Sequence, residues 1–446
     1  RAGGRRPPRA RPRGARWARA RRGPAAAAAC RGARGPRRVL IGRDTRESGE
    51  WMTEALAEGV AGAAAGPVDA GVLSTPAVSF LTRDGGYDAG LVVSASHNPY
   101  QDNGVKVFTA GGEKAGADLE ARITASVAEP DPVPPAGSSP VERVSIAEAY
   151  LDHTAGILRG VEVPAAFRMA IDCANGATSR LAPAVLRRLG LAPVVLHDRP
   201  DGRNINRGCG SMHPASLGRA VVEQGCDLGA AFDGDGDRVV LVDHRGLAVP
   251  GDAVLLVAAR WLAARGRLPH RGVVATVMSN IALEQALAAE GVTLHRCAVG
   301  DRLVREEMRR RGLALGGEQS GHVIFGDHLP TGDGLATALM ILRAMLDSGR
   351  PLADLAADLA LRPQVLLNVE VRRRARLDEL PGVSALVEAA AGDLGRDGRV
   401  LVRYSGTEPL LRIMIEGPDE ARIRGLAEAI AERVRAEIGV GPGVRG

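Results

Sequence analysis

The sequence predicts three α/β units followed by a smaller α+β unit. From Arg38 onward, short β-branched runs alternate with longer amphipathic stretches, a pattern typical of βαβ units with mostly parallel sheets. The chain has 446 residues, of which 45% are apolar and 25% charged, the composition of an ordinary globular protein. Because one hydrophobic core rarely serves more than about 250–300 residues, several domains are expected.

The first unit opens with VLIGRD at 39–44, which predicts a strand. Residues 51–65 then predict an alanine-rich helix ended by Gly66-Pro67, and LVVSAS at 91–96 predicts a second, buried strand. The stretch EPDPVPPAGSS at 129–139 is rich in proline and small residues, which indicates a domain boundary or a long loop. We therefore place the first domain at residues 39–146.

Three further domains follow, at residues 147–249, 250–362 and 363–446. The second is expected to contain three strands and two helices, at 167–176, 193–197, 227–232, 178–189 and 215–224. The third combines two helices and a strand, at 253–265, 281–289 and 273–279. The last has three strands followed by a helix, at 365–372, 399–405, 411–417 and 419–437. This order is typical of α+β rather than doubly wound structure.

Residues 1–38 differ from the rest in composition, and we expect this arginine-rich segment not to fold. They hold 14 of the 58 basic residues and no acidic residue, which leaves 44 basic against 52 acidic side chains in residues 39–446. A basic tail can bind nucleic acid or an anionic surface. Trp17 is its single aromatic residue, however, and it shows no helical or strand period. We therefore expect no nucleic-acid partner.

Membrane and secreted classes are disfavoured. No stretch approaches the roughly 18–20 apolar residues of a membrane span. The five alanines after Arg21-Arg22 do not form the apolar region of a signal peptide. The cysteines are odd in number and lack CxxC spacing, which indicates neither a disulfide framework nor a zinc site: Cys30, Cys173, Cys209, Cys226 and Cys297. We expect a cytoplasmic protein with no membrane partner.

The run AFDGDGDRVVLVD at 231–243 is the strongest chemical signal. Asp233, Asp235 and Asp237 alternate with glycines directly after a predicted strand, so their carboxylates can converge on one hard divalent cation. An EF-hand loop would need glycine and glutamate where this loop has Arg238 and His244. Three carboxylates with open coordination suit Mg²⁺ that shares a phosphate oxygen, and an acidic turn without metal is the alternative.

Two other polar loops have binding chemistry. In LVRYSGTEPLLRIMIEG at 401–417, a tight hydroxyl-bearing turn is flanked by two guanidinium groups, which suits a phosphate: Arg403, Ser405, Gly406, Thr407 and Arg412. In GGEQSGHVIFGD at 316–327, Glu318, Ser320 and His322 could read sugar hydroxyls. Plain hydrophilic turns are the alternative in both places. The loops PDGRNINRGCGSMHP at 200–214 and AVGDRLV at 298–304 indicate no mechanism of their own.

The run VVSASHNPYQDNGVKVF at 92–108 combines Ser96, His97 and Lys106 after a buried strand. A serine hydrolase would show a Gly-x-Ser-x-Gly turn, and His97 is too close in sequence to act well as a base for Ser96. The acidic loop and the anion-binding turn favour phosphoryl transfer instead, with phosphorylated Ser96 sharing the cation held by the three aspartates. Lys106, one of two lysines in the chain, could neutralise the transferring group or exchange a proton, and His97 stays a second candidate for proton transfer.

Four motifs together resemble the α-D-phosphohexomutase superfamily: SASHNP, DGDGDR, GEQSGH and RYSGTEP. The resemblance covers residues from about Val39 to Ile438, and its details are similar to the bacterial phosphoglucosamine mutase branch. It implies three doubly wound α/β domains plus a C-terminal α+β domain around a central cleft.

The resemblance also implies roles for individual residues. Catalytic roles fall on Ser96, His97, Lys106 and Arg238, and the Mg²⁺ site comprises Ser96 with Asp233, Asp235 and Asp237. Sugar recognition falls on Glu318 and Ser320, and the substrate phosphate on Arg403, Ser405, Gly406, Thr407 and Arg412. The implied reaction interconverts glucosamine 6-phosphate and glucosamine 1-phosphate through a hexosamine bisphosphate, supplying UDP-N-acetylglucosamine and the cell wall.

Two alternatives remain beside this hypothesis. One is a phosphomannomutase/phosphoglucomutase, whose relatives tend to have Thr-Gly-Ser-His-Asn-Pro at the serine motif. The other is a catalytically impaired sugar-phosphate-binding homologue, because the family's opening Gly-Thr-Asp-Gly-hydrophobic-Arg-Gly loop has no counterpart in residues 1–38. The composition of that segment resembles a GC-rich reading frame translated out of register, a hypothesis that sequencing the start of the gene tests.

Overall fold

The computed structural model describes residues 37–128, 141–145, 147–405 and 408–440. These residues form two compact units. The larger unit contains the described residues up to Thr276 together with Cys297–Ala356, and the smaller contains Val277–Arg296 and the described residues from Ala357 onward. The predicted loop at 129–139 lies outside the described residues, as do residues 1–36.

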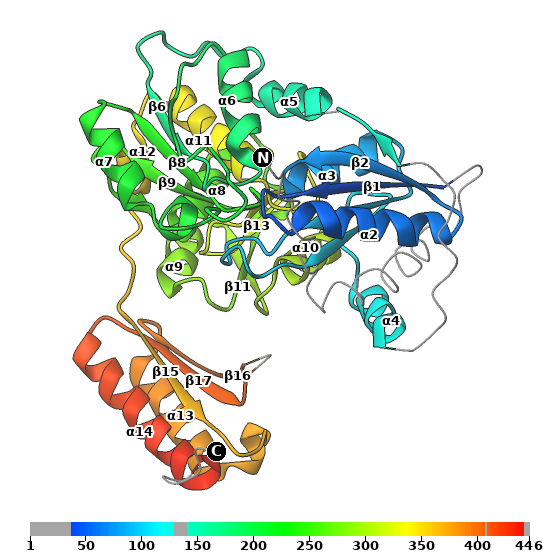
Figure 1. Cartoon of the computed structure of the whole chain (residues 1–446). Helices are drawn as coiled ribbons and strands as arrows, with labels where there is room; N and C mark the ends of the chain where they lie inside the picture. Colours follow the sequence, from blue (N-terminus) through cyan, green and yellow to red (C-terminus); the bar gives the residue numbers. More distant parts are fainter. Residues whose placement is uncertain (1–36, 129–140, 146, 406–407, 441–446) are drawn as a thin grey trace, which may run out of the picture. The chain divides into compact units, whose positions relative to one another are not determined.

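The first sheet of the larger unit has the strand order β4-β3-β1-β2-β5, in which only the β3–β4 pair is antiparallel. Val39 and Ile41 of β1 pack against α2, whereas Gly42 lies against Val78 of α3, so the two helices cover opposite faces of the sheet (Figure 1). The elements are β1 (Arg38–Arg43), α2 (Gly49–Gly62), β2 (Gly66–Val72), α3 (Thr75–Asp84), β3 (Ala89–Val93), β4 (Val105–Thr109), α4 (Ala117–Ala128) and β5 (Glu142–Arg143).

The second sheet has the order β10-β9-β8-β6-β7. Its β8–β6 and β6–β7 pairs are parallel, and its β8–β9 and β9–β10 pairs are antiparallel. The elements are α5 (Ala147–Ala155), β6 (Met169–Asp172), α6 (Thr178–Arg188), β7 (Val194–Leu196), α7 (Ala215–Glu223), β8 (Leu228–Phe232), β9 (Val239–Asp243) and β10 (Ala248–Val249). The acidic loop 233–238 joins β8 to β9, so it is a tight β-hairpin connection.

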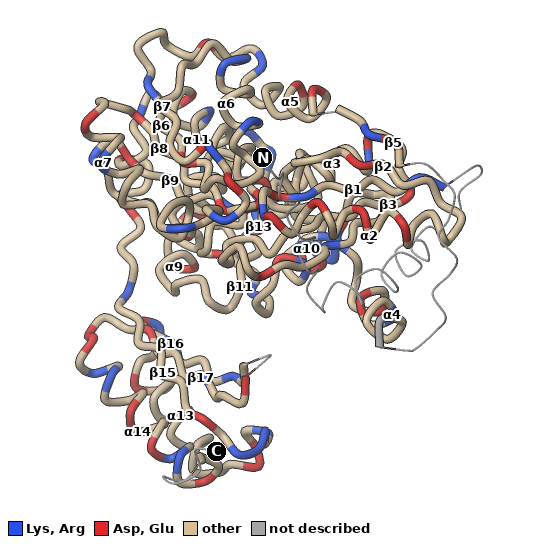
Figure 2. The backbone as a smooth tube through the Cα atoms, in the orientation of Figure 1, with Lys and Arg blue, Asp and Glu red and all other residues tan. Residues whose placement is uncertain are grey.

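In the third sheet, β13 pairs in parallel with β11 and antiparallel with β14. Helices α8 and α11 are apolar on almost every side and lie buried, whereas α10 carries acidic and basic residues along its length (Figure 2). The elements are α8 (Gly251–Ala264), β11 (Gly272–Thr276), α10 (Asp301–Arg311), β13 (Leu315–Gly317), β14 (Val323–Phe325), α11 (Gly334–Ser348) and α12 (Leu352–Ala356).

The smaller unit has an antiparallel sheet of order β15-β17-β16, with α13 and α14 packed on it. Alternate strand residues such as Leu411, Ile413 and Ile415 are fully buried against Ile423 and Val434 of α14. The elements are α9 (Ile281–Ala289), β12 (Thr293–Cys297), β15 (Gln364–Glu370), α13 (Pro381–Leu394), β16 (Arg399–Tyr404), β17 (Leu410–Glu416) and α14 (Glu420–Ile438).

The predicted fold class, three α/β domains plus a C-terminal α+β domain, is confirmed. Three strands end three or more residues before their predicted limits, because β3 ends at Val93, β6 at Asp172 and β11 at Thr276. Gly66-Pro67 begins β2 as well as following a helix. Among the described residues, no helix is both long enough and apolar enough to span a bilayer.

Candidate active site

The loop that carries Ser96 begins where β3 ends. Ser96 has a φ of 52°, an uncommon conformation for a residue with a side chain, and such conformations cluster at functional sites. Its backbone N–H donates to Ser94 Oγ at 2.9 Å, and Ser94 Oγ donates to Asp44 Oδ2 at 2.7 Å. A buried hydrogen-bonded chain therefore holds the turn that presents Ser96.

The guanidinium of Arg46 holds the rest of this loop in place. Its side chain is fully buried and paired with Asp44 at 2.9 Å. Its guanidinium donates to the carbonyl oxygens of Ser96, Asn98 and Asp102 at 2.9, 2.9 and 3.0 Å, and also to that of Pro99. The planar, five-donor guanidinium suits four converging carbonyl groups, so this one side chain defines the backbone path from Ser96 to Asp102.

The acidic loop lies directly against the serine loop. Ser96 Oγ donates to Asp233 Oδ2 at 2.5 Å, although the two residues are 137 positions apart. A Cβ on Gly234 would lie 2.6 Å from the carbonyl oxygen of Ser96, so glycine is required at this close approach. The structure thus brings together the serine and the first aspartate of the two predicted motifs.

The three aspartates are buried together, and two of them, Asp235 and Asp237, share a lysine partner. Lys106 Nζ, from β4, donates to Oδ2 of both Asp235 and Asp237, at 2.5 and 2.8 Å. Asp235 also accepts from the hydroxyl of Thr75 at the start of α3. The second oxygens, Asp235 Oδ1 and Asp237 Oδ1, are buried without a hydrogen-bond partner. Hard cations take carboxylate oxygens as ligands, and two such oxygens are unpartnered here. These residues therefore fit a divalent metal ion.

The charged groups in this cluster strongly shift one another's pKa values. Burial and the neighbouring carboxylates of Asp237 and Asp235 raise the pKa of Asp233 well above its usual value. Burial acts in the same direction on Asp237, but Lys106, His322 and Lys114 hold its pKa well below the usual value. Among neighbouring carboxylates, such divergence indicates a site that is short of positive charge at Asp233 and well supplied at Asp237.

His97 and Arg238 lie beside Ser96. His97 Nδ1 is 3.4 Å from Ser96 Oγ and 3.2 Å from Arg238 Nη1. Because arginine can only donate, His97 Nδ1 accepts that hydrogen bond and carries no proton. Burial and the charge of Arg238 lower the pKa of His97. The Nδ1 atom of His97, its nitrogen nearer to Ser96, is therefore already engaged by Arg238.

The loop that is predicted to recognise the sugar follows β13. Glu318 is buried, and its Oε1 accepts from the backbone N–H of Gly300 at 3.1 Å. Ser320 is exposed at the turn. His322 is buried with its Nδ1 3.7 Å from Asp237 Oδ1, and its Nε2 accepts from the backbone N–H of Gly332 at 3.1 Å. The loop thus contacts the acidic cluster through His322.

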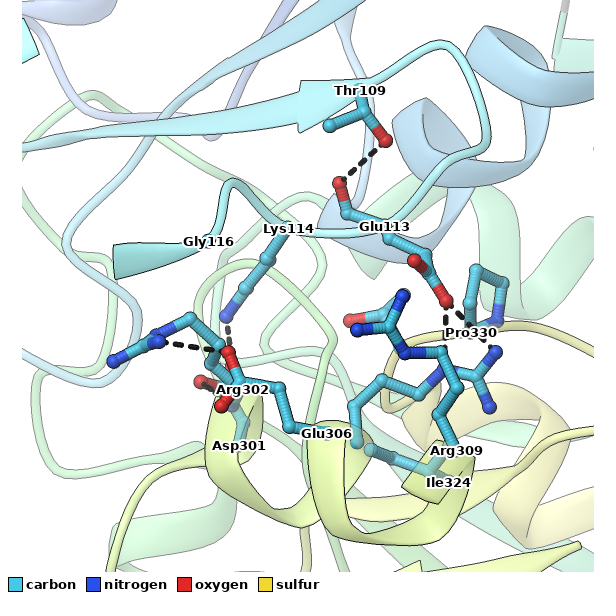
Figure 3. A pocket seen from close by; sticks show the side chains of 12 residues that line it. Thr109, Glu113, Lys114, Gly116, Asp301, Arg302, Glu306, Arg309, Ile324 and Pro330 are labelled. Atoms are coloured by element: carbon cyan, nitrogen blue, oxygen red, sulfur yellow. Dashed lines mark hydrogen bonds and ion pairs between the residues drawn. The ribbon is translucent and has the colours of Figure 1, made fainter. Parts of the chain in front are cut away.

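A cavity of about 190 Å³ lies next to this cluster, between the turn that follows β4 and helix α10 (Figure 3). Lys114 points to Asp301, and its Nζ is 4.0 Å from Asp237 Oδ2. Arg305 pairs with Glu113 at 2.9 Å, and both residues line the cavity. Burial and the ammonium of Lys106 lower the pKa of Lys114 to about 8. Lys114 therefore connects the cavity to the acidic loop.

The predicted phosphate loop belongs to the smaller unit. Arg403 of β16 and Arg412 of β17 are direct cross-strand neighbours, an arrangement of like charges that is unfavourable unless an anion accompanies it. Arg412 Nη2 lies 3.4 Å from Ser405 Oγ and pairs with Glu408 at 3.0 Å. Burial and Arg412 lower the pKa of Arg403. Gly406 and Thr407 lie outside the described residues.

Several contributors carry no motif that would have identified them. Thr75 and Lys114 contact the acidic loop, and Asp301 pairs with Lys114, although all three are distant from that loop in the sequence. Asn206 donates to the carbonyl oxygens of Ser96 and Asn98 at 2.9 and 3.0 Å. Asn206 and Asp301 lie in the two glycine-rich loops that the sequence marked as polar without assigning a role.

Comparisons with known proteins place this geometry in a family. The phosphoglucomutase/phosphomannomutase family models match in four parts: alpha/beta/alpha domains I, II and III at residues 19–133, 148–246 and 250–362, and the C-terminal domain at 366–433. A phosphoglucosamine mutase of Koribacter versatilis is 47% identical over 413 residues, which are 90% of this chain and 89% of the relative. The chain belongs to the phosphoglucosamine mutase family of phosphohexomutases.

Solved structures agree on the fold. A phosphoglucomutase/phosphomannomutase family protein from Burkholderia thailandensis has a TM-score of 0.77 at 24% identity, covering 97% of this chain and 94% of that one. Aspergillus fumigatus N-acetylphosphoglucosamine mutase, solved with GlcNAc-6P and magnesium, has a TM-score of 0.62 at 20% identity, covering 81% and 92%. The predicted resemblance and enzyme class are confirmed: this phosphohexomutase is an isomerase that transfers phosphoryl groups.

Proposed function

We propose that this phosphohexomutase interconverts glucosamine 6-phosphate and glucosamine 1-phosphate through a phosphorylated Ser96. The observation that carries the proposal is the contact between Ser96 Oγ and Asp233, the first carboxylate of a buried three-aspartate loop. A phosphoryl group on Ser96 would lie beside the only three-aspartate cluster in the described residues. Curated phosphoglucosamine mutases of 44–47% identity support this substrate over mannose or glucose phosphates.

The first half-reaction transfers the phosphoryl group from Ser96 to the sugar. The P–O bond to Ser96 Oγ breaks, a P–O bond to sugar O1 forms, and the O1 hydroxyl releases its proton. After the hexosamine bisphosphate reorients, Ser96 Oγ accepts the phosphoryl group from O6, and O6 regains a proton. Each cycle therefore regenerates phosphorylated Ser96, and no phosphate is consumed.

We assign neutralisation of the transferring group to Lys106 and Arg238. Burial acts to lower the pKa of Lys106, but Asp235 and Asp237 outweigh it and raise that pKa, so Lys106 stays charged and can donate a hydrogen bond to an oxyanion. His97 is the weaker candidate for proton transfer, because its Nδ1 already accepts from Arg238. A divalent cation, for which we propose Mg²⁺, would be held by Ser96 and the three aspartates and would supply positive charge for the phosphate oxygens.

Substrate recognition is assigned to groups in both units. Glu318, buried and oriented by Gly300, and the exposed Ser320 would contact the sugar hydroxyls. The cross-strand arginines Arg403 and Arg412, with Ser405, Gly406 and Thr407, would bind the phosphate that is not reacting. Such a clamp must accept either end of the bisphosphate, so it relies on charge rather than on sugar contacts.

The test is turnover by the purified full chain. Glucosamine 6-phosphate should be converted to the 1-phosphate at least about tenfold more efficiently than mannose or glucose phosphates, a ratio that one extra amine contact provides. Intact mass should show a single phosphoryl group, lost in the variant Ser96→Ala. Preference for mannose phosphate would favour the alternative enzyme, and binding without turnover would favour the impaired homologue.

A further inference from the structure

Three potential metal ligands meet at one end of the second sheet, outside the active site. Asp172 is the last residue of β6, His197 directly follows β7, and Cys209 directly precedes the 3-10 turn Gly210–Met212. One ligand atom from each lies within 4.8 Å of the other two. Asp172 and Cys209 are 0% and 1% exposed, whereas the side chain of His197 is 34% exposed. The cluster is therefore buried on two sides and open to solvent through the imidazole.

The hydrogen bonds around the cluster already orient its ligands. Asp172 Oδ1 accepts from the backbone N–H of Ala174 at 2.9 Å, which leaves Oδ2 directed to His197 Nδ1, also at 2.9 Å. Cys209 Sγ accepts from Asn175 Nδ2 at 3.8 Å. Outer hydrogen bonds of this kind hold the ligands of known protein metal sites in place. A mixed oxygen, nitrogen and sulfur set suits Zn²⁺ and similar thiophilic ions, and not Mg²⁺.

We propose that Asp172, His197 and Cys209 form a second cation site, specific for a thiophilic divalent ion such as Zn²⁺, whose occupancy is transmitted to the Ser96 loop. The three residues are far apart in the sequence and lack the short spacings that identify zinc motifs, which is why the cysteine pattern gave no indication of such a site.

The ligand atoms, which lie within 4.8 Å of one another, must shift to bind an ion. Ligand atoms of a tetrahedral zinc site lie about 3.3–3.7 Å apart, given metal–ligand bonds of about 2.0–2.3 Å. Asp172 Oδ2 and His197 Nδ1 must therefore separate slightly, and the exposed imidazole can move to do so. On binding, the Cys209 thiol loses its proton to solvent, and the Nδ1 proton of His197 moves to Nε2, so one proton is released per ion. Solvent at the open side completes the coordination.

A short path of backbone and hydrogen bonds leads from this cluster to the Ser96 loop. Asn206, three residues before Cys209, donates to the carbonyl oxygen of Ser96 at 2.9 Å. Its own N–H donates to the carbonyl oxygen of Ala174, two residues beyond Asp172, at 2.9 Å. Movement of Cys209 or Asp172 toward an ion would therefore displace the group that holds the backbone of Ser96.

The backbone along this path is strained. The described residues include eight non-glycine residues with positive φ, and five of them lie here: Ser96, Ala174, Asn175, His197 and Asn206, with φ between 49° and 58°. Such conformations cost of order 1–3 kcal/mol each and persist only where the surroundings enforce them. A change in ligand positions would act on a backbone that is already held away from its preferred conformations.

Co²⁺ tests the site directly, because cobalt replaces zinc and gives a near-ultraviolet charge-transfer band only when a thiolate binds it. The full chain with excess Mg²⁺ should show this band with Co²⁺ at a stoichiometry of one, and Zn²⁺ should abolish it. Cys209→Ser should remove the band, and His197→Asn, which tolerates positive φ, should weaken Co²⁺ binding at least about tenfold. Cys226→Ser is the matched control, because Cys226 is similarly buried in the same domain and belongs to none of the potential metal-ligand groups found among the described residues.

No band in the full chain, or the same band in Cys209→Ser, overturns the site. The transmission is tested separately, by mutase turnover with saturating Mg²⁺ and a Zn²⁺ concentration that fully displaces Co²⁺. We expect slowing of between about 3- and 100-fold in the unsubstituted chain and in Cys226→Ser, but not in Cys209→Ser. A band without slowing overturns the transmission alone. This kinetic measurement rests on the proposed function, whereas the spectroscopic one does not.

Discussion

The two regions to which we assign the phosphate groups, the acidic cluster around Asp233 and the C-terminal loop, differ in the sign of their unbalanced charge. The reacting centre gathers four carboxylates, those of Asp233, Asp235, Asp237 and Asp301, among three cations, Lys106, Lys114 and Arg238. The C-terminal loop instead places Arg403 directly opposite Arg412, with Glu408 as an exposed partner of one of them. One region lacks positive charge and the other lacks negative charge.

This difference separates chemistry from binding. The orphaned oxygens of Asp235 and Asp237 can bind a cation, which in our proposal also neutralises the transferring phosphoryl group. The paired arginines can be satisfied by any phosphate, whichever end of the sugar carries it. We therefore expect substitutions in the first region to change turnover and those in the second to change affinity, and the following predictions test that division from the largest effect to the smallest.

Ser96→Ala removes the group that carries the phosphoryl between the two half-reactions. We expect turnover to fall by more than about 1,000-fold, the scale of losing a catalytic nucleophile. Binding of glucosamine 6-phosphate, measured by calorimetry, should change less than about threefold, because the C-terminal loop is intact. A variant that keeps full activity would exclude the phosphoserine mechanism, and one that loses binding as well would break the proposed division.

Asp235→Asn should be the next most severe change, lowering turnover by about 100-fold or more, as would chelation of the metal in the unsubstituted enzyme. A second readout is independent of activity. A ligand at 100 times its dissociation constant stabilises the folded state by about 2.7 kcal/mol, so Mg²⁺ should raise the melting temperature of the unsubstituted chain and not that of the variant. Equal stabilisation of both proteins by Mg²⁺ would place the ion elsewhere.

How far the sequence anticipates these regions depends on how each is built. DGDGDR and the β16–β17 loop hold their polar groups within a few residues, so spacing alone allowed a cation site and an anion-binding turn to be predicted there. Alternating apolar runs likewise predicted β1, β8 and β17 nearly to the residue, because burial of one strand is a local pattern.

The supporting residues could not be predicted in this way. Arg46 and Asn206 each bind the serine loop from other parts of the chain, 50 and 110 residues away from Ser96. Their partners are backbone carbonyl groups, which leave no trace in side-chain spacing. Helices α10, α11 and α13 escaped prediction for a different reason: α10 is largely charged, and α11 and α13 lack the polar face that marks an exposed helix.

Arg412→Ala tests the binding side of the comparison. Loss of one charge-assisted contact of about 1.5–3 kcal/mol should raise KM for glucosamine 6-phosphate by about 10- to 100-fold with a smaller change in kcat. Arg376→Ala is the matched control, since Arg376 lies in the same domain and pairs with Asp378 at the surface. A loss confined to kcat would show that the arginine pair contributes to chemistry, contrary to the division.

The smallest predicted effect concerns Lys114, a cation that titrates at an accessible pH, unlike the arginines of the C-terminal loop. Burial and Lys106 lower the pKa of Lys114 from 10.5 to about 8. Between these values the unfolded chain binds more protons than the folded one, so stability should rise with pH across this window. Lys114→Met should remove that rise, on the order of 1 kcal/mol after allowance for partial solvent exposure.

Urea unfolding at pH 8 and pH 10, with chelator present, measures the effect. The difference in unfolding free energy between the two pH values should be more positive for the unsubstituted chain than for Lys114→Met. Arg305→Met is the control, because it removes a cation from the same cavity that does not titrate in this range. An identical pH response in the unsubstituted chain and Lys114→Met would show that Asp301 and Asp237 stabilise the ammonium enough to offset its burial. Both lysines of the acidic cluster would then stay charged across this pH range, as the arginines of the C-terminal loop do.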